Sequence, residues 1–477
     1  MMATSLIISG ILSLLVSIVV ARSVSVAQFG IYSITVSLQN VVGIFSAFSI
    51  GTAVAKYVSE YAVRDPKQAV MFVKTGLRLV LLFSSVTAVV YFVLADLIGN
   101  GLYDEPGVAE LIPFSALVVF SLAVLALASG VAQGNHRMKL LSSMQVATPA
   151  ISLCVIAAFI PYVGVRIAFV SLFIAQMTVS LSALYRLSRT STWKWGKMEP
   201  QSETDHPKIL LSFAVPAVIA TVMVVPLYWF GNTVLALYSG FLAVGQFAIA
   251  LVFFQALSIM PYALALPLVP RVSEMSVHSK DEIESLISRA VRAVSVLFFP
   301  VFFALALFCR PVIGILYGSD YYDSTEAVYL VVAACYLSAT VSTVGAAITG
   351  LGRMWVGLGL NMAWAGIFAV VALIAVPMYG PEGLGLAYAV SYGIHLVNTI
   401  VTSEKVLHLR IQKIVAPIAP AVVLFAVGFS LVMDTDALSF VWRLVLLAAG
   451  TGLMLWLGRK EFKMVYDRVL TRGHGSA

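Results

Sequence analysis

The amino-acid sequence predicts an all-α integral membrane protein of about 14 transmembrane helices. Three observations support this fold class. Of the 477 residues, 61% are hydrophobic and only 11% are charged, and long apolar stretches recur along the whole chain. The basic residues fall almost entirely in alternate loops, and short sequence matches recur in order with a nearly constant separation. This composition excludes a soluble enzyme, a nucleic-acid-binding protein and a disordered scaffold.

Each span is placed where about 20 consecutive apolar residues occur, the length needed to cross a bilayer. The first apolar stretch lacks a basic flank before it and a small-residue cleavage site after it, so we interpret it as a span and not as a signal peptide. Six spans are expected near residues 3–21, 30–54, 76–98, 110–133, 141–162 and 165–185. Six more are expected near 209–238, 241–267, 291–316, 328–350, 355–378 and 381–402, and a last pair near 414–433 and 440–458.

The longest polar interruption, from Arg186 to Lys208, divides these spans into groups. We therefore predict an N-lobe of six spans (1–190), a cytoplasmic linker (191–208), a C-lobe of six spans (209–404), and a C-terminal part with spans thirteen and fourteen and a cytoplasmic tail (405–477).

The distribution of positive charge predicts the orientation of the chain. Cytoplasmic loops of membrane proteins carry an excess of Lys and Arg. With the N-terminus in the cytoplasm, only four of the 29 Lys and Arg residues fall on the outer side, namely Arg22, Arg166, Arg310 and Arg443. We therefore expect a multi-pass protein of the plasma or inner membrane with both termini in the cytoplasm.

Collinear matches between the two six-span groups predict an internal duplication. Six spans separate the copies, an even number, so both copies have the same orientation and are related by an axis along the membrane normal. Two such bundles would face each other across a central cleft. The matches are Val26-Ala-Gln28-Phe29-Gly-Ile31 with Val244-Gly-Gln246-Phe247-Ala-Ile249, Val58-Ser59-Glu60 with Val272-Ser273-Glu274, Ile98-Gly99 followed by Leu102-Tyr103 with Ile313-Gly314 followed by Leu316-Tyr317, and Gly134-Asn-His-Arg137-Met138 with Gly350-Leu-Gly-Arg353-Met354.

The sequence lacks the features that most membrane enzymes need. No phosphate-binding Gly-x-x-x-x-Gly-Lys-Ser/Thr loop is present, and the outer acidic residues lie in short loops without a paired His. Cys154, Cys309 and Cys335 lie in separate apolar stretches with no paired spacing. We therefore predict that the protein is not an enzyme, has no cofactor, catalytic residue or metal site, and binds no nucleic acid; the coupling ion is left open.

The charges near the spans favour an anionic substrate. A transporter of cations would be expected to hold Asp or Glu within its spans, and no acidic residue lies at the middle of a predicted span. Basic candidates are available instead: Arg22 ends the first span, Lys56 ends the second, and Lys74 and Arg78 begin the third with a four-residue spacing. Their alternative role is ordinary snorkelling of cytoplasmic positive charges.

Amide side chains within the spans could contact a polar substrate or join helices to one another. The substrate-binding candidates among them are Gln39, Asn40, Asn232 and Asn361.

Several segments occur in a recognisable order along the chain: Ala21-Arg22 to Gly30-Ile-Tyr32, Gly51-Thr-Ala53-Val-Ala-Lys56-Tyr57, Phe213-Ala-Val-Pro216, Gly245-Gln-Phe247 and Leu316-Tyr317-Gly318. In this order they resemble polysaccharide and oligosaccharide flippases of the MOP superfamily, the Wzx-like polysaccharide transporters. The resemblance implies two six-helix lobes around a cationic cleft. It also implies a polyprenyl-pyrophosphate-linked glycan as cargo, moved from the inner to the outer leaflet by alternating access, and glycan assembly enzymes as possible partners.

The resulting hypothesis assigns a role to each group of residues. Lys56, Lys74 and Arg78 gather the pyrophosphate at the cytoplasmic mouth, Arg22 attracts it further out, and the amides contact the sugars. Two alternatives remain: a cation antiporter of the multidrug and toxin extrusion type, and a membrane subunit of a glycan assembly complex that does not itself transport.

Overall fold

The computed structural model describes residues 2–189, 205–222, 225–265, 267–275, 280–405, 418–432, 437–457 and 459. Every regular element in these ranges is helical, as the sequence predicts. The chain forms two compact units, unit 1 (Met1–Gly245) and unit 2 (Gln246–Ala477), which we describe separately. Most of the predicted linker (191–208) and of the predicted tail lies outside the described residues, and the predicted lobe boundaries stay predictions.

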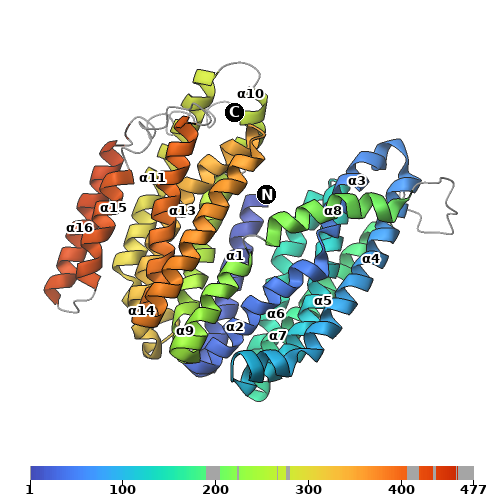
Figure 1. Cartoon of the computed structure of the whole chain (residues 1–477), viewed down its shortest axis with the longest axis horizontal. Helices are drawn as coiled ribbons and strands as arrows, with labels where there is room; N and C mark the ends of the chain where they lie inside the picture. The colour runs from blue at the N-terminus through green and yellow to red at the C-terminus, as the bar shows by residue number, and fades with distance from the viewer. Residues whose placement is uncertain are drawn as a thin grey trace, which may run out of the picture. The chain divides into compact units, whose positions relative to one another are not determined.

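Unit 1 is built around one central helix, α5, which packs against α2, α3, α4 and α7 (Figure 1). The helices of this unit are α1 (Met2–Ser23), α2 (Val26–Ala47), α3 (Ile50–Arg64), α4 (Pro66–Val93), the π-helical turn η1 (Leu97–Leu102), α5 (Pro106–Gly134), α6 (Met138–Val163), α7 (Arg166–Ser188), α8 (His206–Val222) and the first part of α9 (Val225–Ala265).

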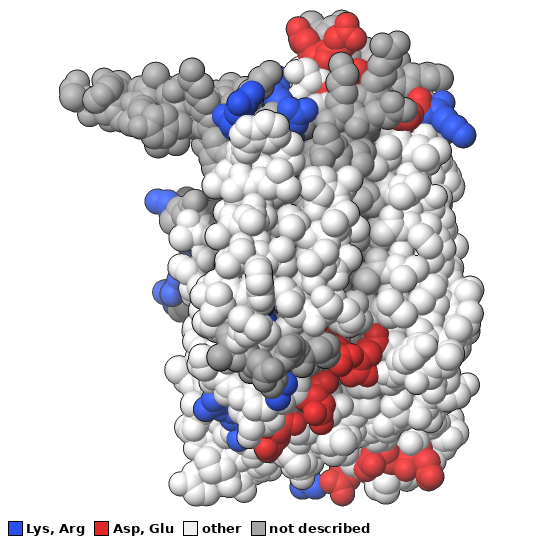
Figure 2. All heavy atoms as spheres, turned by 90° about the vertical axis from the view of Figure 1, so that its left-hand side faces the viewer, with Lys and Arg blue, Asp and Glu red and all other residues white. Residues whose placement is uncertain are grey.

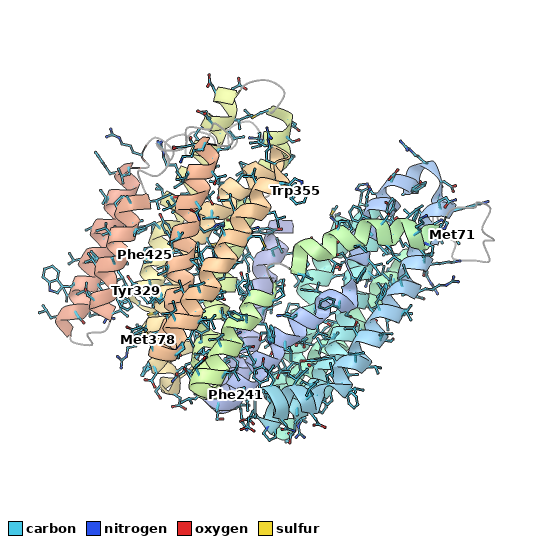
Figure 3. The ribbon with its side chains drawn as sticks, in the orientation of Figure 1. Met71, Phe241, Tyr329, Trp355, Met378 and Phe425 are labelled. Atoms are coloured by element: carbon cyan, nitrogen blue, oxygen red, sulfur yellow. The ribbon has the colours of Figure 1, made fainter. Side chains whose placement is uncertain are left out.

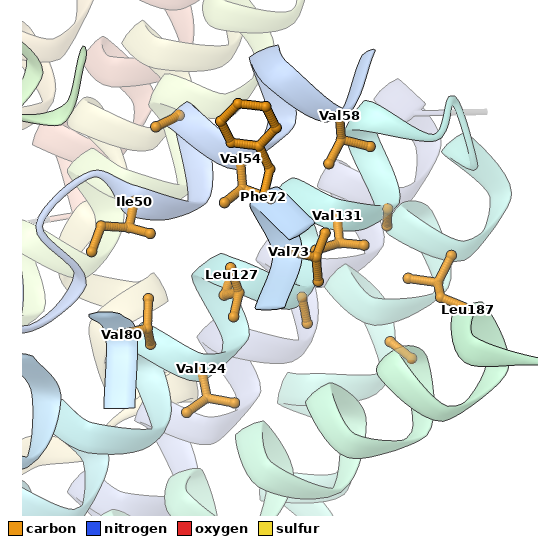
Figure 4. Packing of buried hydrophobic residues seen from close by; sticks show 14 of the residues in the cluster. Ile50, Val54, Val58, Phe72, Val73, Val80, Val124, Leu127, Val131 and Leu187 are labelled. Carbon is orange, nitrogen blue, oxygen red and sulfur yellow. The ribbon is translucent and has the colours of Figure 1, made fainter. Parts of the chain in front are cut away.

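Close contact between α3, α4 and α5 forms the main core of unit 1. Val54 of α3, Phe72 of α4 and Leu127 of α5 are completely buried there (Figure 4). A Cβ atom on Gly130 would collide with the backbone carbonyl of Gly51, so α3 and α5 approach each other at backbone distance. Small residues at such crossings are typical of packed membrane helices.

The second predicted span (30–54) is interrupted, which the sequence does not predict. Phe48 (φ 44°) and Ser49 (φ 51°) both adopt the left-handed conformation and separate α2 from α3. This conformation is unfavourable for residues with a Cβ atom. The hydroxyl of Ser46 donates a hydrogen bond to Val119 O of α5 (2.7 Å), so a contact distant in sequence holds the chain beside the break.

Unit 2 consists of helices that follow the same alternation of long apolar segments and short turns. They are the rest of α9, α10 (Leu268–Met275), α11 (Lys280–Leu307), α12 (Cys309–Leu316), the 3-10 turn η2 (Ser319–Ser324), α13 (Thr325–Gly350), α14 (Met354–Lys405), α15 (Ile418–Val432) and α16 (Ala437–Leu457).

Two very long helices turn at a glycine. Gly240 in α9 (φ 78°, ψ 177°) and Gly380 in α14 (φ 56°, ψ −128°) have non-helical backbones. Both lie where the sequence predicts the end of one span and the start of the next. In the described part of the chain, eleven helices are long and apolar enough to cross a membrane, so the all-α membrane fold is confirmed, and the count of 14 spans stays a prediction.

The C-terminal helices α15 and α16 are firmly attached to the rest of unit 2. The hydroxyl of Tyr329 on α13 donates a hydrogen bond to Phe425 O of α15 (2.6 Å), and the two residues lie close together in Figure 3. Arg443 of α16 is 4% exposed. Its guanidinium donates to Leu431 O, Val432 O and Leu307 O, which lie at the C-terminal ends of α15 and α11.

The duplicated Gly-x-x-Arg-Met motif has the same local structure in both units. In unit 1 the Arg137 amide donates to Ala132 O (2.9 Å) and the His136 amide to Gln133 O (2.9 Å), which closes α5 with a Schellman turn. In unit 2 the Arg353 amide donates to Ile348 O (3.1 Å) and the Gly352 amide to Thr349 O (3.0 Å).

The glycine that begins each copy of the motif also packs in the same way. A Cβ atom on Gly134 would lie 2.7 Å from Ala55 O and 2.8 Å from Val58 Cβ. A Cβ atom on Gly350 would lie 2.7 Å from Val269 O and 2.9 Å from Val272 Cβ. Val58 and Val272 are themselves matched in the sequence repeat, so the duplication extends to tertiary contacts.

The charged side chains leave a broad apolar surface between them. Figure 2 shows a broad area without Lys, Arg, Asp or Glu across the middle of this face, with most charged side chains nearer the top and bottom and a few basic ones at its left edge. Exposed residues such as Val93, Val370 and Val423 contribute to the apolar surface of the helices. An apolar exterior of this kind is expected of a protein whose solvent is lipid.

Candidate functional site

Three of the predicted cationic residues lie on two helices of unit 1 that pack against each other. Lys56 is on α3, and Lys74 and Arg78 lie one turn apart on α4. The rings of Tyr57 and Phe72 stack between these helices with centroids 4.9 Å apart. The structure therefore places Lys56 on the helix adjacent to that of Lys74 and Arg78.

The ammonium group of Lys56 is oriented by aromatic rings. Its Nζ lies 4.8 Å from the ring centroid of Tyr57 and 4.9 Å from that of Phe213 on α8. Cation–π attraction of this kind holds the charge in place without neutralising it. Lys56 and Arg78 are exposed and Lys74 is half-buried, so positive charge from both helices reaches the surface of unit 1.

Arg22 lies in the last turn of α1, where its side chain is exposed. A cation in this position complements the partial negative charge at a helix C-terminus, which gives the residue a structural role as well. Contact between Arg22 and substrate stays a prediction.

The predicted amides differ in burial and belong to different units. Gln39 of α2 is 5% exposed, and its Oε1 has no hydrogen-bond partner among the described residues. The adjacent Asn40 is exposed. Asn232 of α9 is buried, and the exposed Asn361 of α14 is the one predicted residue that belongs to unit 2.

A buried polar chain next to Asn232 was missed by the sequence interpretation. Trp229 Nε1 donates to the Tyr103 hydroxyl (2.9 Å), which also bonds to Thr233 Oγ1 (2.8 Å). Burial raises the pKa of the Tyr103 phenol, so this group remains neutral. The sequence signal for Tyr103 was present, because it lies in the repeated segment that begins at Ile98, but no signal linked it to Trp229 and Thr233.

A second polar group lies inside unit 2. His395, Thr399 and Ser403 follow one another at four-residue intervals on one face of α14, and each is at most 5% exposed. The Trp364 ring lies 6.3 Å from the His395 ring. Among the described residues, His395 Nδ1, Thr399 Oγ1, Ser403 Oγ and Trp364 Nε1 have no hydrogen-bond partner. The presence of a lone His in an apolar stretch is the sequence signal for this group.

Three of the four arginines predicted on the outer side have local partners. Arg166 forms an exposed ion pair with Glu110 (2.6 Å). The Arg310 guanidinium lies 5.0 Å from the ring centroid of Tyr322. Arg443 is buried against the backbone carbonyls described above. These contacts explain the three arginines by local structure.

Comparison with known proteins identifies the family. The sequence profile of the polysaccharide biosynthesis protein family matches residues 19–326. The chain belongs to this family. A relative in Ralstonia nicotianae, the EPS I polysaccharide export inner membrane protein EpsE, is 21% identical over 394 residues, which cover 79% of this chain and 86% of the relative.

Solved structures show that this family member has the fold of MOP superfamily transporters. The lipid II flippase MurJ in an inward closed conformation is 12% identical, with a TM-score of 0.75, and the match covers 96% of this chain and 99% of MurJ. An inward-facing multidrug resistance MATE family transporter of the MOP superfamily is 14% identical, with a TM-score of 0.70 over 85% of this chain and 96% of its own. The chain is thus a multi-span membrane protein with a flippase-type transporter fold.

Proposed function

We propose that the protein moves a polyprenyl-pyrophosphate-linked oligosaccharide from the cytoplasmic to the outer leaflet for the assembly of a surface polysaccharide. The family match over residues 19–326 is the observation that carries this proposal, and the fold of a lipid II flippase supports it. The relative EpsE is named for polysaccharide export.

The energetics of the cargo explain why such a protein is needed. An unpaired ion costs many kcal/mol to bury in hydrocarbon, so a diphosphate does not cross a bilayer unaided. The polyprenyl tail is soluble in the membrane, and the protein has to shield only the charged, hydroxyl-rich headgroup.

The cationic side chains of α3 and α4 favour a substrate with an anionic headgroup. In this proposal Lys56, Lys74 and Arg78 attract the pyrophosphate at the cytoplasmic end, and Arg22 attracts it further along the path. Lys and Arg form short charge-assisted hydrogen bonds to phosphate oxygens. Gln39, Asn40, Asn232 and Asn361 supply hydrogen-bonding groups for sugar hydroxyls, and Gln39 Oε1 has no hydrogen-bond partner among the described residues.

The test is reconstitution of the purified protein into liposomes that contain a fluorescent polyprenyl-diphosphate sugar. The fraction of label accessible from outside reports translocation. We expect R78A and K74A to reduce the rate at least about tenfold, because each removes one charge-assisted contact with the headgroup. R289A, which removes an exposed arginine of α11 in unit 2, is the matched control and should retain the wild-type rate.

The result also separates the alternatives. Wild-type protein that fails to translocate the lipid would favour the non-transporting membrane subunit. A cation antiporter is the second candidate because MATE transporters share the fold. Resistance to cationic drugs on expression, without translocation of the glycan lipid, would support that activity instead.

A further inference from the structure

A pocket of about 630 Å³ opens on unit 1 at the turn between α5 and α6. His136, Arg137 and Lys139 line it from this turn, and Arg186 lines it from the end of α7. All four side chains are exposed. None of these residues belongs to the predicted substrate path of Arg22, Lys56, Lys74 and Arg78.

The charge of the pocket is positive among the residues that the structure describes. No carboxylate is among the residues that line it, and no ion pair joins Arg137, Lys139 or Arg186 to an acidic residue in the described part of the chain. The first turn of the 26-residue helix α6 also lines the pocket, and Arg137 at its N-cap makes no side-chain capping bond. The N-terminus of a helix adds further positive potential.

The turn between α5 and α6 has a histidine at a position where glycine is usual. His136 adopts φ 55°, whereas Gly352 holds the corresponding position of the same turn in unit 2 with φ 70°. Glycine is the ordinary residue at this position of a Schellman turn. A histidine at this strained position puts an imidazole side chain in the lining of the pocket.

The wall of the pocket also has an apolar part, formed by Met138 and Leu140. Four basic groups next to apolar side chains match a phosphate group that is attached to a lipid, since the phosphate meets the cations while its apolar portion lies against the wall. We infer that this pocket binds the phosphate of a lipid headgroup at the membrane surface. The phosphate can come from a phosphodiester lipid of the bilayer or from a lipid diphosphate.

Binding to the full-length protein in a neutral maltoside detergent tests the inference without any transport step. The probes are short-chain phosphatidylglycerol and inorganic pyrophosphate, titrated separately by microscale thermophoresis. We expect both to bind the wild type, and R137A/R186A to weaken binding at least about tenfold through the loss of two charge-assisted contacts. The matched control R189A/R353A removes two exposed arginines that do not line the pocket and should change the affinity less than twofold.

The two probes distinguish the sources. Binding of phosphatidylglycerol alone identifies a bilayer phosphodiester lipid, binding of pyrophosphate alone identifies a diphosphate, and loss of either in R137A/R186A supports the site. Equal weakening in R189A/R353A, or wild-type affinity in R137A/R186A, would overturn it, as would a wild type that binds neither probe. Because no step requires translocation, failure of this test leaves the proposed flippase function intact.

The variant H136G excludes a merely structural explanation. Glycine relieves the backbone at φ 55°, so the variant should be at least as heat-stable as the wild type. We nevertheless expect its affinity for the bound probe to fall about threefold to tenfold, because one pocket donor is lost. Unchanged affinity would remove His136 from the site.

Discussion

His136 holds a backbone conformation that glycine adopts more easily. For a residue with a Cβ atom, the left-handed conformation costs about 1–2 kcal/mol. A change to glycine removes this cost, but it also raises the conformational entropy of the unfolded chain, which offsets part of the gain in stability. We expect H136G to raise the free energy of unfolding by about 0.5–1 kcal/mol. The reciprocal change G352A, at φ 70°, should lower it by about 1 kcal/mol. Thermal unfolding in detergent measures both, and a destabilised H136G would show that the His136 side chain stabilises the turn.

Thr399 gives a second prediction at the level of one atom. Its side chain is 1% exposed, and Oγ1 has no partner among the described residues. A buried hydroxyl without a hydrogen bond costs about 1–3 kcal/mol, and valine has nearly the same shape. T399V should therefore leave the melting temperature unchanged or raise it. S121A is the contrasting variant, because Ser121 Oγ bonds to Gln176 Oε1 (2.7 Å), and it should lower the melting temperature. A marked loss of stability in T399V would show that the hydroxyl is hydrogen-bonded to water.

The sequence predicts which residues are candidates for substrate binding, but it does not predict which side chains from other helices contact them. Lys56, Lys74 and Arg78 were evident from their charge at the ends of apolar stretches. The contact of Lys56 with Phe213 was not, because the two residues are far apart in sequence and meet only through the packing of α3 and α8. The Trp229–Tyr103 hydrogen bond was missed for the same reason. The spacing of apolar residues indicates which face of a helix is buried, but not which other helix packs against that face.

The helix boundaries that the sequence predicts are those set by a residue at the boundary itself, such as glycine. Gly240 and Gly380 lie where the predicted spans end, because glycine tolerates the non-helical backbone of a tight reversal. The break between α2 and α3 has no such residue. Phe48 and Ser49 take left-handed conformations, and the nearby Ser46–Val119 hydrogen bond shows that tertiary contacts hold this region. A single-sequence pattern therefore predicts one continuous span.

Arg443 decides how the helix pair α15–α16 is attached. Its guanidinium satisfies carbonyl groups at the ends of two helices, and a buried carbonyl left without its donor typically costs about 1–3 kcal/mol. We expect R443M to lower the stability by at least about 2 kcal/mol and to expose the C-terminal helices to limited proteolysis. R310M is the control, because Arg310 is only half-buried and contacts a single aromatic ring, Tyr322. Equal protease resistance of R443M and wild type would contradict the attachment.

At the scale of the whole molecule, duplication explains why the architecture could be inferred from short matches. The two Gly-x-x-Arg-Met segments close equivalent helices with the same turn, and Gly134 and Gly350 pack on equivalent valines. Steric requirements at these contacts restrict the sequence on both sides of each contact, whereas lipid-facing positions require only apolar character. The matches therefore mark packing positions. The charges of the loops predict the orientation of the chain, and the lengths of the apolar stretches predict the positions of the spans.

The orientation of the chain is the last property that the charges predict. Three of the four arginines on the expected outer side are explained by local contacts: Arg166 with Glu110, Arg310 with Tyr322, and Arg443 with helix-terminal carbonyls. The basic residues of the opposite loops, such as Lys139 and Arg353, are exposed. Because only four of the 29 Lys and Arg residues fall on the opposite side, these loops are predicted to be cytoplasmic, which the proposed direction of transport also requires.

Cysteine labelling measures this orientation directly. In a background without Cys154, Cys309 and Cys335, a membrane-impermeant maleimide should label K139C and R353C in inside-out vesicles but not in intact spheroplasts. D104C and D320C should show the opposite pattern, because Asp104 and Asp320 are exposed in turns on the expected outer side. Labelling of K139C and R353C from opposite sides would mean that an odd number of spans separates them. That result would rule out a parallel repeat, because the two copies of the Schellman turn would then face opposite leaflets.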